Sequence, residues 1–277
     1  MQRLVDTLVF SPSDLNGFLE CEYLTRLDVE AAHGRVIEKR RRPEADLLAA
    51  RGFAHERDHL GRLRSNGLCV LEIEEPGGEV GWAEAARETR QAMESGADAI
   101  YQGVLSGADV AWRGRADLLI RVDRPSALGQ WSYEAWDTKL ARHAKPKHVL
   151  QLAFYTEGVA AIQGREPEWM HVILGNGEDE HFRCRDYMAY YRRVRERFLR
   201  SVEAGIDATP IKVEHCGLCG YGHHCDAYRR ERDHLSLVAS IRRSQIERLH
   251  AVGIDTCAAL GSTADRPRSS MARHRES

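Results

Sequence analysis

The sequence predicts an α/β domain in which helices pack over a central sheet. Three neighbouring segments have strand character, helical segments flank them on both sides, and a further strand follows the second helical region. With 277 residues, of which 43% are hydrophobic, the chain is long enough to bury one sizeable core.

The N-terminal third is predicted to be mainly helical. Ser11 and Pro12 are typical of a helix start, and the apolar residues that follow recur at helical spacing, which puts Cys21 inside an amphipathic helix. A second helix is expected from Pro43 to about residue 64 and carries His55. A short strand over 68–73 and a helix over 82–95 follow.

The middle of the chain is predicted to form the sheet. Residues 99–105, 110–122 and 132–140 alternate in the manner of strands, with turns between them, so we expect a mainly antiparallel arrangement of these three. The remaining elements are a helix over 146–161, strands at 169–174 and near 181–184, and a long helix over 186–203.

The C-terminal part is expected to be a separate element. Residues 233–261 have the pattern of a helix, a tight turn at Gly253 and a second helix, which resembles a helix-hairpin-helix; a small packing hairpin would have the same pattern. We therefore divide the chain into a main domain at 1–232, this element at 233–261 and a disordered tail at 262–277.

Composition limits the function classes. The net charge of -2 argues against a globally cationic nucleic-acid binder, so contact with DNA would rely on local basic patches such as residues 39–42. No segment has the apolar length of a membrane span or the features of a signal peptide, and we expect a cytoplasmic protein.

Two carboxylates and an amine form the candidate catalytic set. Asp117 lies in one predicted strand, and Asp137 and Lys139 lie in the next, where alternation puts the latter two on one face. Hydrolysis of a phosphodiester requires an activated water and positive charge near the phosphate, and carboxylate-bound divalent ions supply both. We expect Asp137 to bind the metal and Lys139 to orient or deprotonate the attacking water.

Neighbouring residues extend this set. Gln151 and Tyr155 lie one turn apart on the following helix and are candidates for contact with substrate phosphate. His55 can offer a neutral imidazole nitrogen as a metal ligand, although a lone histidine is more often a surface residue.

Four short motifs follow one another in the chain, and together they resemble the successive motifs of RecB-like PD-(D/E)XK nucleases over about residues 11–228. They are Gly52-x-x-His55, Gly114-x-x-Asp117, Asp137-x-Lys139 and Gln151-x-x-x-Tyr155. The resemblance implies a restriction-endonuclease-like mixed sheet flanked by helices. It also implies that His55, Asp117, Asp137 and the main-chain carbonyl of Thr138 bind Mg²⁺ or Mn²⁺, with Lys139 catalytic. Asp137 stands where many members have Glu.

Three of the seven cysteines, Cys216, Cys219 and Cys225, lie within ten positions. Three thiolates do not complete a tetrahedral or cubane site, so a fourth ligand is needed, and Cys21 is the natural candidate. One distant N-terminal cysteine with a C-terminal trio resembles CRISPR-associated RecB-like exonucleases and AddB-type nuclease subunits. That resemblance implies a structural [4Fe-4S] cluster that joins the two ends of the domain.

Zinc is the rival to the cluster, because histidines in the same loop could complete a local tetrahedral site. These histidines are His215, His223 and His224. The isolated Cys69, Cys184 and Cys257 are interpreted as structural.

The resulting expectation is a DNA nuclease, more specifically an exonuclease on single strands or DNA ends. The alternative is a non-cleaving, cluster-bearing DNA-binding module that serves a partner helicase or an integration complex. A third interpretation, an α/β protein without a nucleic-acid role, treats the ordered motifs as coincidence. No nucleotide-binding P-loop is present, so any motor would be a separate protein. A nuclease of this kind could act in repair, in recombination or in CRISPR spacer handling, and the sequence does not distinguish these pathways.

Overall fold

The computed structural model describes residues 1–4, 7–40, 43–106 and 112–264, and the chain forms two compact units. Unit 1 comprises Met1–Ile37 and Pro43–Asp207, and unit 2 comprises Glu38–Arg42 and Ala208–Ser277. The cysteine loop thus belongs with the C-terminal helices, whereas the boundary was predicted after residue 232. The reason is that the segment after the last long helix of unit 1 packs with its own neighbours in sequence and with residues 38–40.

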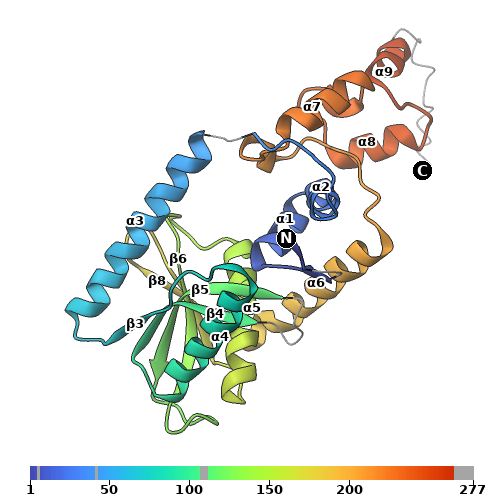
Figure 1. The fold of residues 1–277 in the computed structure, drawn as a ribbon. Coiled ribbons are helices and arrows are strands. Elements are labelled where there is room, and N and C mark those ends of the chain that lie inside the picture. Colours follow the sequence, from blue (N-terminus) through green and yellow to red (C-terminus); the bar gives the residue numbers. More distant parts are fainter. Residues whose placement is uncertain (5–6, 41–42, 107–111, 265–277) are drawn as a thin grey trace, which may run out of the picture. The chain divides into compact units, whose positions relative to one another are not determined.

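Unit 1 contains a six-stranded mixed sheet with helices against it, which confirms the α/β class (Figure 1). The strand order follows the sequence order, and the pairs β3–β4 and β6–β7 are parallel while the other three are antiparallel. The strands are β3 (Val70–Glu72), β4 (Ala99–Ser106), β5 (Arg113–Val122), β6 (Ser132–Thr138), β7 (Trp169–Ile173) and β8 (Asp179–Arg183).

The central antiparallel strands match the prediction closely. Val104 and Leu105 of β4 are paired with β5, and β5 is paired with β6 through Leu118 and Trp136. Residues 110 and 111 of the predicted second strand lie outside the described part of the chain. The two parallel pairs each need a helical crossover, which the helices α4 (Gly78–Glu94) and α5 (Pro146–Gln163) provide.

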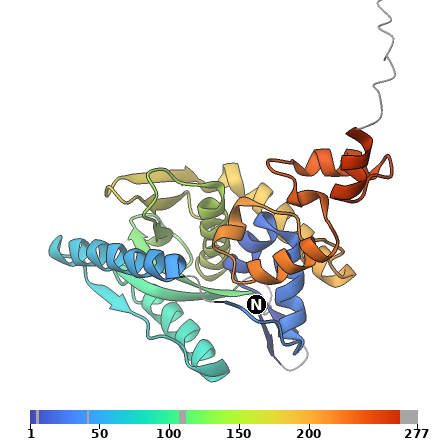
Figure 2. The same cartoon turned by 90° about the horizontal axis from the view of Figure 1, so that it is seen from above.

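Helix α5 occupies the centre of unit 1. It packs against strands β4 to β7 on one side and against α1 and α6 on the other (Figure 2). Most of its residues are buried. A helix that is apolar around most of its circumference is stable only when it is covered on several sides. The other helices of this unit are α1 (Pro12–Glu20), α2 (Glu22–Ala32), α3 (Pro43–Ser65) and α6 (Cys184–Ala204); α4 packs on β4 and α3 on β6.

The segment around Cys21 differs from the prediction of one continuous helix. Cys21 has φ -162° and ψ 106°, an extended conformation that ends α1 and begins α2. Apolar residues keep helical spacing through the break. Leu15 and Phe18 of α1 and Leu27 of α2 are all buried, so the spacing reports burial and does not show where one helix ends. Cys21 is therefore the N-cap of α2 and does not lie inside a helix.

An additional hairpin precedes these helices. Strands β1 (Gln2–Leu4) and β2 (Thr7–Val9) pair in antiparallel fashion, and Phe10 forms a bridge with Trp112 beside β5. No such strands were predicted, because three-residue strands have too few positions to display an alternating pattern.

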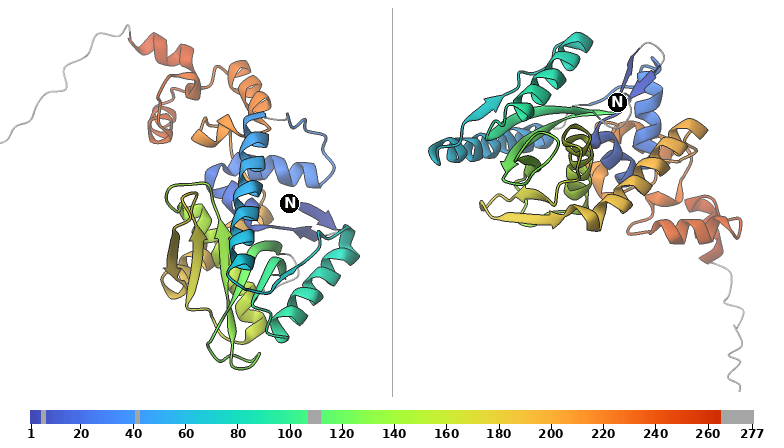
Figure 3. Two further views of the ribbon diagram at one scale, coloured as in Figure 1. Left: turned by 90° about the vertical axis from the view of Figure 1, so that its left-hand side faces the viewer. Right: turned by 90° about the horizontal axis from the view of Figure 1, so that it is seen from below.

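Unit 2 consists of short helices (Figure 3). The predicted helix-turn-helix is present: Gly253, with φ 74°, lies in the connection between the last two helices, and Ile246 is buried. A bridge between His234 and Thr256 ties this element to the preceding chain. The elements are η1 (Glu214–Gly217), α7 (Gly222–Glu231), η2 (Leu235–Leu237), α8 (Arg243–His250) and α9 (Cys257–Ala264).

Part of the predicted tail is helical, because α9 extends through residue 264; residues 265–277 lie outside the described part. Within the described ranges, no helix combines the length and the apolar character needed to cross a bilayer.

Candidate active site

The antiparallel pairing of β5 and β6 brings the two predicted carboxylates together. Leu118 and Trp136 are register partners, so Asp117 and Asp137 come next on opposing strands. The main-chain amide of Thr138 donates a hydrogen bond to Asp117 Oδ2 at 2.9 Å, and its hydroxyl donates to the same atom at 3.2 Å. Asp117 is thereby fixed against the strand that carries Asp137.

Lys139 joins the same cluster directly after β6. Its Nζ donates to Asp137 Oδ1 at 2.6 Å, and its main-chain amide donates to the carbonyl of Ile173 in β7 at 2.8 Å. The side chains of Asp137 and Lys139 thus meet as the period of a strand predicts, and the neighbouring parallel strand holds the main chain in place.

Asp137 is the most constrained member of the cluster. Its side chain is fully buried, and burial, followed by the nearby Asp117, raises its pKa well above the usual range. Oδ2 also lies 2.6 Å from the Lys139 nitrogen, but it has no hydrogen-bond partner of acceptable geometry among the described residues. A buried carboxylate oxygen without a hydrogen bond, beside a second carboxylate, fits a site that binds a hard divalent cation.

The protonation of Lys139 follows from the same neighbours. Burial opposes the charge on its amine, but Asp137 and Asp117 outweigh burial and raise its pKa, so the group remains an ammonium ion. In this form Lys139 can donate hydrogen bonds to a water molecule or to a phosphate oxygen.

Gln151 and Tyr155 reach the site from α5. The Gln151 amide donates to Asp137 Oδ1 at 3.2 Å and to the Tyr155 hydroxyl at 3.4 Å. Tyr155 is 4% exposed, and burial raises its pKa above the usual range, so its hydroxyl stays protonated. Both residues therefore join the carboxylate cluster, while contact with substrate phosphate stays a prediction for each.

Helix α3 contributes His55 and Glu56. His55 is half-buried, and its Nε2 lies 3.5 Å from the carbonyl of Ile173, the same carbonyl that receives the Lys139 amide. The predicted metal ligand is thus near the main chain of the cluster, and among the residues that the structure describes its ring is held by this long contact.

Glu56 is a site residue that no sequence pattern had indicated. It is 6% exposed, and burial, followed by Asp117, raises its pKa. It receives hydrogen bonds from Gln102 and Tyr101 of β4, and burial, followed by Glu56, raises the Tyr101 pKa to about 12. Its position directly after His55 gave no signal, because helix α3 has several exposed acidic residues and only the contact with β4 distinguishes Glu56.

Gln102 has an unusual backbone for a strand residue. Its φ of 57° lies in the left-handed region, which non-glycine residues seldom occupy, and the β4–β5 pairing skips it between Tyr101 and Gly103. This conformation accompanies the hydrogen bond from its side chain to Glu56.

The four cysteines predicted as cluster ligands lie in both units. Cys216 belongs to η1, Cys219 follows it, and Cys225 lies in α7, all in unit 2, whereas Cys21 lies in unit 1. The iron-sulfur cluster therefore stays a prediction. Burial raises the pKa of Cys184 to about 12, which keeps this thiol protonated and agrees with a structural role.

No protein-family model matches the chain, and no curated protein sequence matches it.

Proposed function

We propose that the chain is a metal-dependent DNA nuclease that hydrolyses phosphodiester bonds in single strands or at DNA ends. The observation that carries this proposal is the convergence of Asp117, Asp137 and Lys139, where a buried Asp137 oxygen lacks a hydrogen bond from the described residues. Two acidic groups and an amine at one point of a sheet are the parts that phosphodiester hydrolysis requires.

Asp117 and Asp137 would hold Mg²⁺ or Mn²⁺, together with His55 and the carbonyl of Thr138. When bound, the ion supplies positive charge to the phosphate and an activated water. Hydrogen bonds from the Thr138 amide and hydroxyl hold the Asp117 carboxylate beside β6, and the hydrogen bond from Gln151 holds the Asp137 carboxylate. The raised pKa of Lys139 favours the role of orienting the water over that of removing its proton.

The proposal includes a structural [4Fe-4S] cluster on Cys21, Cys216, Cys219 and Cys225. Cys21 supports this assignment because it is the N-cap of α2, and the positive end of a helix dipole stabilises a thiolate. Zinc bound within the loop is the competing occupant.

The main test measures cleavage of an end-labelled single-stranded oligonucleotide with Mn²⁺. We expect the unaltered protein to cut it and Lys139→Ala to lower the rate by roughly 10²- to 10³-fold, the usual effect of losing a hydrogen-bond donor directed at the reacting atoms. Lys212→Ala removes an exposed lysine of unit 2 and should leave the rate unchanged. Intact substrate after incubation with protein that retains its cluster would contradict the proposal.

The second candidate is a DNA-binding module that does not cut. The pair α8 and α9 favours it, since a helix pair with a tight turn can hold a phosphate with main-chain amides. Binding of the oligonucleotide by the unaltered protein without cleavage, equal to that of Lys139→Ala, would support this candidate over the nuclease.

A further inference from the structure

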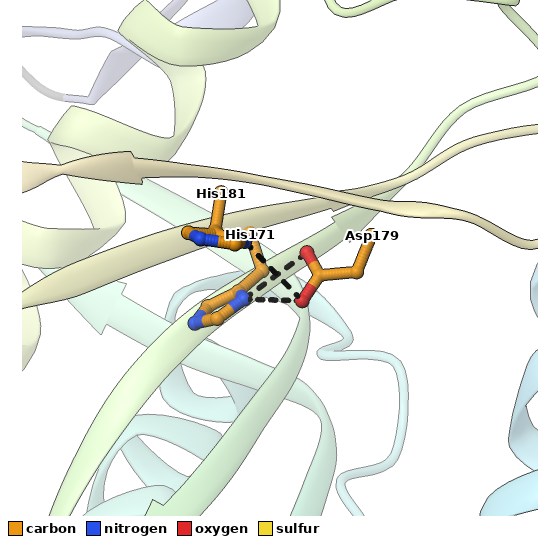
Figure 4. A group of neighbouring side chains, drawn as sticks. All are labelled: His171, Asp179 and His181. Carbon is orange, nitrogen blue, oxygen red and sulfur yellow. Dashed lines mark hydrogen bonds and ion pairs between the residues drawn. The ribbon is translucent and has the colours of Figure 1, made fainter.

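A second group of side chains with potential metal-ligand atoms lies on strands β7 and β8, apart from the carboxylates described above. His171 of β7 and His181 of β8 are register partners, and Asp179 lies two residues before His181, so all three project from one face of this strand pair. One potential ligand atom from each residue lies within 4.8 Å of the other two (Figure 4).

The Asp179 carboxylate faces the Nδ1 atoms of both imidazole rings from one side (Figure 4). His171 Nδ1 is 2.9 Å from Asp179 Oδ2 and 3.1 Å from Oδ1, and His181 Nδ1 is 4.0 Å from Oδ2. Ligand atoms about 2.1 Å from an ion at tetrahedral angles are about 3.4 Å apart. The observed separations lie on both sides of this value, so small side-chain rotations suffice to accommodate an ion.

The His171 ring is held in a fixed orientation by groups outside the cluster. Its Nε2 lies 3.1 Å from the carboxylate of Glu134, and the ring stacks on Trp136 with centroids 4.2 Å apart. Metal-binding histidines in proteins characteristically give their other ring nitrogen to a carboxylate, which sets the ring orientation and the protonation pattern. The Glu134 contact has this form, and it leaves Nδ1 facing Asp179.

Without an ion, a doubly protonated His171 ring can donate from Nδ1 to Asp179 and from Nε2 to Glu134, and a bound cation would take the place of the Nδ1 proton. Asp179 and His181 are also partly open to solvent, with side-chain exposures of 34% and 54%. An ion can therefore enter the cluster from outside, while the buried Glu134 and the Trp136 ring support it from below.

We propose that His171, Asp179 and His181 form a binding site for a transition-metal dication of the zinc type. Two imidazole nitrogens and one carboxylate oxygen suit Zn²⁺, Co²⁺ or Ni²⁺, whereas Mg²⁺ requires oxygen ligands, so the site differs in metal preference from the Asp117–Asp137 cluster. The ion would join β8, at the edge of the sheet, to β7.

The test is a calorimetric titration of the full-length protein with Zn²⁺ in excess Mg²⁺, after removal of loosely bound metal. We expect Asp179→Asn and His181→Gln each to bind one zinc ion fewer than the unaltered protein, or to bind it at least roughly 10- to 100-fold more weakly. His143→Gln is the matched control, because His143 is an exposed histidine that contacts Glu180 of the same strand.

Each outcome decides the proposal. Both altered side chains are at least one-third exposed, so neither substitution removes core packing, and a thermal unfolding scan of each variant verifies that it is folded. Zinc bound at the cysteine loop is common to all three variants and cancels in the comparison.

Equal stoichiometry and affinity in all proteins would overturn the proposal and reduce the cluster to a hydrogen-bonded network. The titration involves no cleavage and is independent of the proposed nuclease activity.

Discussion

The Asp137 side chain is a fully buried carboxyl group, and its surroundings make the charged form unfavourable. Burial of a carboxylate disfavours the charged form, and Asp117 adds repulsion; Lys139 and Gln151 offset only part of this. A protein retains such a group when the charge serves a purpose other than stability. A divalent cation between the carboxylates would remove the repulsion.

The repulsion between the two carboxylates leads to a prediction for Asp137→Asn. The variant should cleave DNA at least roughly 100-fold more slowly, because an oxygen ligand and its charge are lost. Without added metal it should melt at a higher temperature than the unaltered protein, since the repulsion with Asp117 is gone. Mn²⁺ should raise the melting temperature of the unaltered protein and leave that of the variant nearly unchanged.

The measurement is a thermal unfolding scan with and without Mn²⁺, beside a cleavage assay. Asp123→Asn alters an aspartate outside the carboxylate cluster and provides the control. A metal-induced rise of equal size in Asp137→Asn would show that Asp137 does not bind the ion.

Glycine has opposite roles in helices α3 and α5. A Cβ on Gly158 of α5 would lie 3.0 Å from Leu105 Cβ and 3.1 Å from the Ser106 carbonyl oxygen, whereas a Cβ on Gly61 of α3 would have no atom within 4 Å. Glycine in a helix is unfavourable unless the space it saves is needed. At Gly158 this space lets α5 approach β4.

We therefore expect Gly158→Ala to destabilise the protein by about 1–3 kcal/mol through overpacking. The matched substitution Gly61→Ala should stabilise it by about 0.5–1 kcal/mol, because alanine reduces the freedom of the unfolded chain. Urea unfolding measures both. A stabilising effect of Gly158→Ala would mean that α5 and β4 can separate without loss of packing.

The first turn of α5 contains a neutral histidine. Burial, followed by the nearby Lys139, lowers the pKa of His148 to about 4, and its Nδ1 accepts a hydrogen bond from the Lys145 amide at 3.2 Å. Because the pKa is about 6.5 in the unfolded chain, protons bind preferentially to the unfolded state between these two values. The stability from neutral His148 is complete above about pH 6.5 and is lost as the pH falls toward 4.

Replacement of His148 by asparagine should make stability less dependent on pH. Asparagine keeps an acceptor for the Lys145 amide but does not titrate, so between about pH 6.5 and 5 the variant should lose less unfolding free energy than the unaltered protein, by about 1–2 kcal/mol. The raised pKa of Asp137 favours the folded state as the pH falls, which is opposite to the effect of His148. Asp137 is present in both proteins, so its contribution cancels in the comparison. Identical pH profiles would contradict the expectation.

At the scale of the elements, the sheet was predictable because β4, β5 and β6 alternate visibly and are separated by turns. The meeting of Asp117 with Asp137 was predictable from a hairpin alone, since antiparallel register sets residues side by side. The break at Cys21 was not, because apolar spacing reports which side of a helix is buried and not whether its hydrogen bonds continue. The role of Glu56 depends on contacts with β4 and Asp117, which are distant in sequence.

At the scale of the whole molecule, the chain is divided into two units whose covalent connections lie near residues 37–43 and 207–208. Of the predicted cluster ligands, Cys21 belongs to unit 1, and Cys216, Cys219 and Cys225 belong to unit 2.

We expect Cys219→Ala to lose the bound iron and sulfide and to unfold at a lower temperature than the unaltered protein. Cys69→Ala, which removes an exposed cysteine of unit 1, should keep the full iron content. Iron and acid-labile sulfide are measured in protein purified without oxygen. Retention of iron by Cys219→Ala, or zinc in place of iron in the unaltered protein, would contradict the cluster.

The left-handed backbone at Gln102 has a consequence for local opening of unit 1. The β4–β5 pairing skips Gln102, while Tyr101 and Gly103 on either side of it stay paired with β5. Within β4, amide hydrogen exchange should therefore be fastest at Gln102, because local opening there requires no neighbouring residue to leave the sheet.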